Sequence, residues 1–232
     1  SSPRIPTILS KNFQSEINWD KNDYSLSTTF YFKKLSDFFQ PKWSFSFEDF
    51  LAPDNEVINP GYGEIGGLEI QFRVKSGMIT GWISYHNSNT RYQISNFNKS
   101  KIFSADHDKN HELKTVMLGK IFNTNLSASW VYSSGHPFTS LENLYVEFGS
   151  GYEIFLMGDY NNKRIKSSHH LDISAVKNFE ISKVGIELGL SIYNLYNKKN
   201  IAHKRYNPFS REVSMREISM FGITPSIFTK IY

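Results

Sequence analysis

Apolar and polar side chains alternate along Gly67-Leu68-Glu69-Ile70-Gln71-Phe72-Arg73-Val74-Lys75, a stretch whose polar set includes three charges. Successive side chains of a β-strand point to opposite faces, so a strand here has one apolar face and one highly polar face. The same period of two recurs in residues 171–175 and 184–192. A soluble sandwich turns such an apolar face into a core. A transmembrane barrel turns it toward lipid, with the polar face lining a wet lumen.

The composition narrows the class of protein. The chain has 232 residues, 16% of them aromatic, a formal net charge of +4 and no cysteine. The missing cysteines exclude disulfides and thiolate metal sites, and the small, dispersed charge gives no reason to expect a nucleic acid partner. No run of residues is apolar enough for a membrane helix, but a barrel strand needs only about 9–11 half-apolar residues. A carbohydrate-binding sandwich is also compatible with this aromatic content.

Connection lengths separate the two folds. The period of two predicts nine strands, near residues 11–19, 23–33, 66–75, 78–86, 111–122, 125–133, 169–178, 183–194 and 217–232. Short connections alternate with long ones, which cover about 34–65, 87–110, 134–168 and 195–216. Barrels of outer membranes have short periplasmic turns and long extracellular loops, whereas Greek-key sandwiches do not sort their connections by end. We therefore predict an all-β fold, an antiparallel up-and-down transmembrane β-barrel, with a soluble β-sandwich as the alternative.

The strand pattern assigns candidate residues to each face. Polar residues of the alternating segments should face the lumen; these are Glu69, Gln71, Arg73, Asp172 and Glu187. Aromatic residues near strand ends should lie at the membrane interfaces, where amphipathic rings are favoured; these are Trp19, Tyr85, Trp130, Tyr132 and Tyr232.

Three ordered motifs resemble a known family. Ser134-Gly135-His136-Pro137-Phe138-Thr139 follows one predicted strand, and His169-His170-Leu171-Asp172 opens the next. Ser191-Ile192-Tyr193-Asn194-Leu195-Tyr196-Asn197-Lys198-Lys199-Asn200 closes the strand after that. Their order and spacing resemble the C-terminal part of a TonB-dependent outer-membrane receptor of the Bacteroidota type. The chain departs from the family where His170 replaces the usual Arg and where Tyr232 replaces a terminal Phe.

The resemblance implies a 22-stranded barrel closed around an N-terminal plug, with TonB engaged through the N-terminal part. Nine strands leave two unpaired edges, which lipid does not tolerate. We therefore expect residues 1–232 to form the C-terminal portion of the barrel, with the plug and the first strands outside this chain.

The implied function is import of a scarce nutrient, such as a ferric siderophore, across the outer membrane. The alternative is a receptor-like barrel that serves as a structural subunit of a larger outer-membrane complex. The expected partners are outer-membrane lipid, the remainder of the barrel and plug, TonB, and a surface lipoprotein or other subunits of such a complex. No enzyme activity, cofactor or metal is expected.

Two motifs invite other interpretations. Residues 61–66 match G-x-G-x-x-G, but a nucleotide site needs a strand before it and a helix after it, and here a strand follows. We expect a loop that descends into a strand. His107, Asp108 and His111 have the types of metal ligands, but they enter a strand, where side chains diverge, so we expect a hydrated loop end.

A hydrolase-like interpretation rests on His169 and His170, which follow Ser167 and Ser168. Catalysis requires a nucleophile and a base within hydrogen-bond reach and a third group that orients the base. Adjacency in sequence supplies none of these, so we expect no catalytic site.

Overall fold

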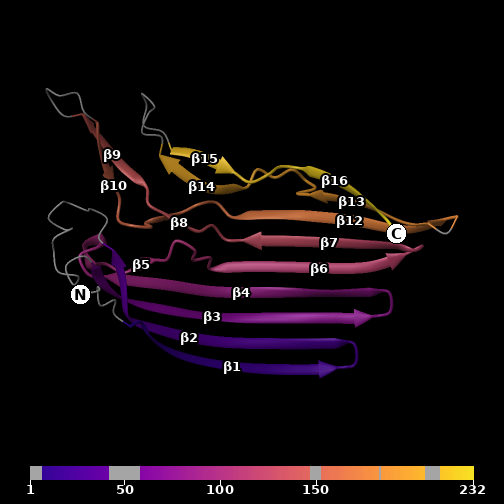
Figure 1. Cartoon of the computed structure of the whole chain (residues 1–232). Coiled ribbons are helices and arrows are strands. Elements are labelled where there is room, and N and C mark those ends of the chain that lie inside the picture. Colours follow the sequence, from indigo (N-terminus) through magenta and orange to yellow (C-terminus); the bar gives the residue numbers. More distant parts are fainter. Residues whose placement is uncertain (1–6, 42–57, 147–152, 183, 207–214) are drawn as a thin grey trace, which may run out of the picture.

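A single large antiparallel sheet dominates the computed structural model, which describes residues 7–41, 58–146, 153–182, 184–206 and 215–232. Nine of its strands follow one another in sequence order across the sheet, β1-β2-β3-β4-β6-β7-β12-β13-β16. They are β1 (Leu9–Lys21), β2 (Tyr24–Pro41), β3 (Ile58–Ser76), β4 (Ile79–Ile94), β6 (His111–Ile121), β7 (Thr124–Ser133), β12 (Ser168–Ile181), β13 (Val184–Tyr193) and β16 (Thr224–Ile231). Figure 1 shows the resulting meander, in which the short turns lie at one end and the long connections at the other.

The prediction of an antiparallel up-and-down sheet is confirmed, and each predicted strand corresponds to one strand of this path. Several predicted boundaries are wrong. The loop expected over 34–65 is strand in its first eight and last eight residues, because β2 runs on to Pro41 and β3 starts at Ile58. The loop expected over 87–110 begins later, because β4 runs on to Ile94. Residues 217–219, expected in the last strand, instead belong to β15, and β16 begins at Thr224.

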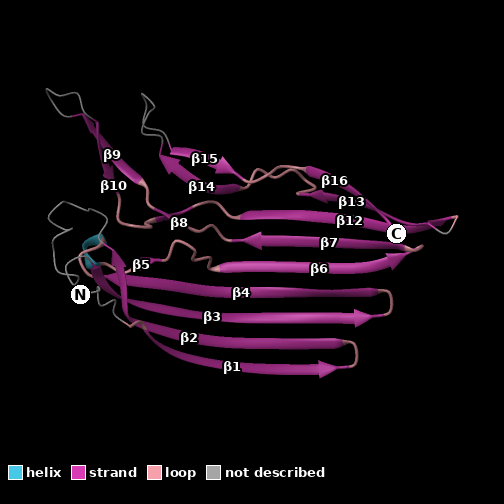
Figure 2. Ribbon diagram, in the orientation of Figure 1, coloured by secondary structure: helices cyan, strands magenta, loops and turns pink. Residues whose placement is uncertain are grey.

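The long connections contain small hairpins of their own. β5 (Phe103–Ser104) pairs with β4, and the other pairs are β8 (Pro137–Phe138) with β11 (Lys163–Arg164), β9 (Leu141–Val146) with β10 (Glu153–Met157) and β14 (Ile201–Tyr206) with β15 (Met215–Ser219). Within the described ranges, one short 3-10 segment, η2 (Asn98–Ser100), lies between β4 and β5 (Figure 2). In the described parts of the chain, no helix is long and apolar enough to cross a membrane.

Cross-strand register carries the alternation across the whole sheet. Ile70 faces Thr28 on one side and Tyr85 on the other, while Ala128 and Ile192 both flank Ile173. We call this side of the sheet the apolar face. The opposite side, the polar face, includes Glu69 between Thr29 and His86.

The apolar face is uncovered in the described structure. Ile17 is 64% exposed, Leu190 50% and Ile227 73%. The buried apolar residues among those described instead gather where the long connections meet the sheet; they are Ile94, Phe103, Ala105, Ile165 and Ile201. A sandwich would bury one face of the sheet against a second layer, so this distribution favours the barrel.

The height of the apolar face can be worked out on β2. Its apolar-face residues from Tyr24 to Phe32 span eight residues, or about 26 Å along the strand at about 3.3 Å per residue. A strand tilt of about 40° reduces this to about 20 Å along the barrel axis, close to the ~25 Å apolar band of outer-membrane barrels.

Candidate functional site

The five predicted lumen-facing residues all lie on the polar face, but they do not form one cluster. Glu69, Gln71 and Arg73 succeed one another on β3, and Gln71 Oε1 accepts a hydrogen bond from Arg73 Nη2 at 2.9 Å. Asp172 and Glu187 lie on β12 and β13. Whether these side chains line a lumen stays a prediction.

The predicted interfacial aromatics are divided between the faces. Trp19 on β1 lies on the apolar face beside a short turn, Tyr85 lies on the same face near the middle of β4, and Trp130 and Tyr132 lie there toward the long connections. Tyr232 is different. Register pairs Ile231 with Ile186, which puts Tyr232 on the polar face, where its ring covers Gly185. We expected Tyr232 to face the membrane interface, but the alternation of side chains along its strand puts its ring on the polar face.

The aromatic residues near the long connections form hydrogen-bonded groups. Tyr85 and His111 share a hydrogen bond of 2.8 Å, from Oη to Nδ1. Tyr196 Oη lies 2.6 Å from His169 Nδ1 and accepts a bond from Trp130 Nε1 at 3.3 Å. His169 therefore contacts a tyrosine in place of a serine nucleophile, which leaves the hydrolase interpretation without its geometry.

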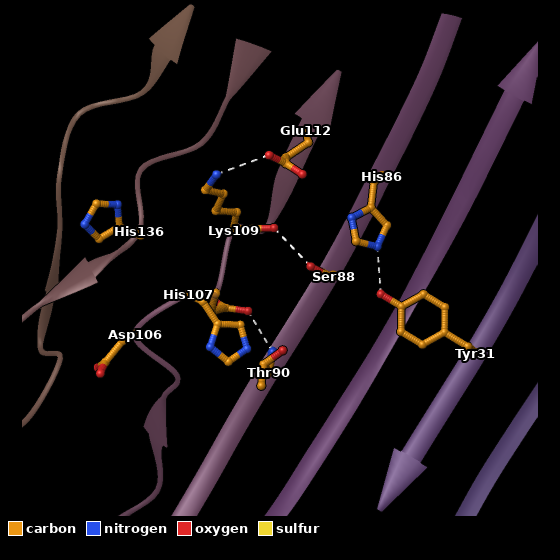
Figure 3. A pocket seen from close by; sticks show the side chains of 10 residues that line it. Tyr31, His86, Ser88, Thr90, Asp106, His107, Lys109, Glu112 and His136 are labelled. Atoms are coloured by element: carbon orange, nitrogen blue, oxygen red, sulfur yellow. Dashed lines mark hydrogen bonds and ion pairs between the residues drawn. The ribbon is translucent and has the colours of Figure 1, made fainter. Parts of the chain in front are cut away.

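A cavity of about 460 Å³ opens on the polar face beside the long connections. Figure 3 shows its wall and its rim. Tyr31 and His86 come from the sheet, while Asp106, Lys109, Glu112 and His136 come from the connections and the start of β6.

Glycine makes room for the wall of this cavity. Tyr31 Oη lies 2.7 Å from His86 Nε2, which ties β2 to β4 across β3. A Cβ on Gly67 would lie 2.4 Å from that hydroxyl oxygen, so only glycine admits the tyrosine ring at this position. Gly63 has the same role, because a Cβ there would lie 2.8 Å from the ring of Tyr92. The glycines of the G-x-G-x-x-G match thus lie within β3, where Gly61 and Gly63 leave room for neighbouring aromatic rings.

An ion pair between the buried Asp108 and the partly exposed Arg164 fixes the rim of the cavity. Asp108 has a fully buried side chain that pairs with Arg164, whose Nη1 also donates to the carbonyls of Asp108 and Gly135 at 2.9 and 3.1 Å. Asp108 Oδ1 accepts the backbone N–H of Thr90 at 2.7 Å. Two long connections are thereby attached to β4. The expectation of a hydrated loop end was wrong for Asp108, although His107 and His111 are exposed.

A second group of contacts joins the same connections. Tyr160 Oη donates to Asp106 Oδ1 at 2.9 Å, and Asn161 Nδ2 donates to the same oxygen at 2.7 Å. Burial and the neighbouring Asp106 carboxylate raise the pKa of Tyr160 to about 12. The Tyr160 ring packs edge-on against Phe97 and Phe103, with centroids 4.9 and 5.2 Å away. These contacts make the rim a packed unit.

The cavity is lined by both acidic and basic side chains. Glu112 is paired with Lys109 at 3.3 Å and with Lys114 at 3.6 Å. Burial lowers the pKa of His136, and the nearby Lys109 and His203 lower it further. The cavity therefore offers donors and acceptors suited to a polar ligand or a polar protein segment. Among the described residues, no group of three or more His, Cys, Asp or Glu is placed to hold a metal ion.

Asparagines organise the connection that follows β13. Asn194 and Asn200 are fully buried. The Asn194 N–H donates to Asp172 Oδ1 at 2.9 Å, and its side chain bonds to the backbone of Lys198. Asn200 exchanges two hydrogen bonds with the backbone of His169. Asp172, a lumen candidate in the sequence, therefore also holds this connection in place.

Solved structures provide the comparison, since no protein-family model and no curated protein matches the sequence. The FrpB iron transporter from Neisseria meningitidis (F3-3 variant) matches with a TM-score of 0.61 and 14% identity, over 99% of this chain and 32% of that chain. The ferric-catecholate import receptor Fiu from E. coli K12, in a closed form, matches with a TM-score of 0.52 and 13% identity, over 96% and 28%. The chain thus spans less than a third of the length of either protein, and at these identities the likeness establishes the fold.

Proposed function

We propose that this chain forms the C-terminal wall of a TonB-dependent outer-membrane receptor. The premise is that FrpB and Fiu are such receptors and that this chain has the fold of their barrels. The receptor would lie in the outer membrane, and its plug and first strands would lie outside residues 1–232. It would import a scarce nutrient such as a ferric siderophore, with energy from TonB through the N-terminal part. The wall itself would carry no catalytic step.

The two-faced sheet is the observation that supports this proposal best. Register keeps apolar side chains on one face across nine strands, while the other face holds charged residues and the cavity. In an outer-membrane barrel the apolar face would meet lipid, and the polar face would enclose the lumen. The short turns would then lie in the periplasm and the long connections outside the cell.

The cavity gives the lumen side a specific role. It lies at the end of the sheet where ligands would enter, and its rim is held by the Asp108–Arg164 pair. A polar cavity held in one shape needs little reorganisation when it receives a ligand or a segment of the plug.

Uptake measurements test the proposal. A strain lacking the full-length receptor would be offered a panel of ⁵⁵Fe-labelled ferric catecholates, ferric hydroxamates and haem, with and without functional TonB. We expect at least one compound whose uptake requires both proteins. Unchanged uptake of every iron source and of other scarce nutrients, with the barrel retained in a fixed-stoichiometry complex, would instead support a structural subunit of an outer-membrane assembly.

A further inference from the structure

Four charged residues form a row on the apolar face, one on each of β1 to β4. Register pairs Lys11 with Lys34, Lys34 with Glu64, and Glu64 with Arg91. All four side chains are exposed, and Lys34 Nζ lies 3.3 Å from Glu64 Oε1. We call these residues the cationic row. Neighbouring strands lie about 4.8 Å apart, so the row spans about 14 Å.

The row carries more positive charge than it neutralises. It has three cations and one carboxylate, and Glu64 is already paired with Lys34. Lys11 and Lys34 lie directly opposite each other, an arrangement that is unfavourable for like charges on adjacent strands. In the described part of the chain, no ion pair neutralises Lys11 or Arg91. An anion bound to the row would remove the repulsion.

The row lies at one edge of the apolar band. Lys34 is ten residues from Tyr24, about 33 Å along the strand and about 25 Å along the axis of a barrel with strands tilted by about 40°. Directly below it, Phe13 and Phe32 are 67% and 42% exposed, and Lys34 Nζ lies 5.5 Å from the Phe32 ring. At Lys34 the apolar side chains thus give way to a cation at the height where hydrocarbon gives way to lipid headgroups, and the strand tilt inclines the row so that its two ends differ in height by about 9 Å.

We propose that the cationic row binds the phosphate groups of anionic lipid in the outer leaflet, so that the receptor holds a phosphorylated lipid against β1 to β4. This inference rests on the proposed function, because it takes the apolar face to be the lipid-facing face. Lysine and arginine form short, charge-assisted hydrogen bonds with phosphate. Basic residues just outside an apolar segment are also the usual feature that recognises anionic lipid.

On the apolar face, the strands that follow β4 carry different side chains near the long connections. On β6, β7 and β12 the apolar-face residues nearest the long connections are His111, Tyr132 and His169, in place of lysine and arginine. A tyrosine ring favours the interface without selecting for charge, and these strands present no lysine or arginine there. Phosphate binding is therefore assigned to one side of the barrel, where β1 to β4 lie.

The test uses the full-length receptor in detergent, with native mass spectrometry as the readout of bound lipid. The probes are lipid A with two phosphates, monophosphoryl lipid A, phosphatidylcholine and inorganic phosphate. The variant is Lys11→Gln/Lys34→Gln/Arg91→Gln. The matched control is Lys21→Gln/Lys177→Gln, which removes two exposed cations from the same face near the short turns.

We expect the triple variant to bind diphosphorylated lipid A at least about tenfold more weakly than the native receptor, and the control variant to bind it normally. Binding should decrease with the number of phosphates on the lipid. Equal binding by native and triple-variant receptors would overturn the inference, as would inorganic phosphate binding as tightly as lipid A. Heat-modified migration in gels reports barrel closure separately, and failure of the native receptor to close would overturn the proposed function as well.

Discussion

Arginine substitution on the two faces of β3 measures which face meets lipid. Ile70 lies six residues from the end of β3, about 20 Å along the strand and about 15 Å along the axis at a tilt of about 40°, close to the middle of a ~25 Å band. Ile70→Arg should therefore destabilise the barrel by about 2–4 kcal/mol. The adjacent Gln71 lies on the polar face between Ser27 and Ser84, so Gln71→Arg should cost less than about 1 kcal/mol.

A second substitution on the apolar face tests how the cost of an arginine depends on its depth in the membrane. Leu188 lies opposite Lys177, where the apolar face already contains a cation. Leu188→Arg should thus cost toward the lower end of the same range, because the charge can reach the interface. The assay is refolding of the full-length receptor into phosphatidylcholine bilayers across a urea series, with the folded fraction read from gel migration. A larger cost for Gln71→Arg than for Ile70→Arg would refute the assignment of the faces.

Three further predictions concern the rim of the cavity. Arg164→Ala leaves the buried Asp108 carboxylate unpaired and should weaken docking of the connections by about 3–5 kcal/mol, which limited proteolysis detects; the exposed Lys163→Ala is the control, and equal cleavage of both would contradict the ion-pair argument. Tyr160 is stabilised as the neutral phenol, so its contribution to docking is complete below pH 10 and is lost as the pH rises toward about 12. Absorbance titration at 295 nm should show this late ionisation disappearing in Tyr160→Phe, and an unchanged curve would exclude it. His136 is stabilised as the neutral imidazole, so its contribution is complete above pH 6.5 and is lost as the pH falls through its lowered pKa. Proteolysis of the connection that carries it should increase at acidic pH in the native receptor and change less in His136→Gln.

The strands of the sheet could be predicted because the sequence pattern of a strand is contained within the strand itself. A period of two in segments of about nine residues identifies a strand and its two faces without knowledge of its neighbours. The extension of β3 toward Ile58 was not recognisable, because Gly61, Gly63 and Gly66 provide no side chain to continue the pattern. Glycine is needed at these positions because of the neighbouring strands: the rings of Phe38 and Tyr92 occupy the space above Gly61 and Gly63.

The cavity was less predictable, since its contacts join residues far apart in sequence. Asp108 and Arg164 are separated by 56 residues, and Tyr31 and His86 by 55. Sequence spacing within a loop gives no information on such pairs. A hydrated loop end was predicted at Asp108, because side chains that enter a strand diverge and cannot hold a metal together. That argument does not detect burial of the carboxylate, which requires a partner such as Arg164.

The orientation of the two faces is the central claim, and spin-label accessibility tests it most directly. Residues 1–232 contain no cysteine, so single cysteines can be introduced in turn from Leu68 to Val74 in a full-length receptor freed of any other cysteine, labelled with a nitroxide and reconstituted in bilayers. The account predicts a period of two, with labels at 68, 70, 72 and 74 relaxed by oxygen dissolved in lipid and labels at 69, 71 and 73 relaxed by a water-soluble nickel chelate. Accessibility with the opposite phase, or with no period of two, would contradict a lipid-facing apolar face and a wet polar face.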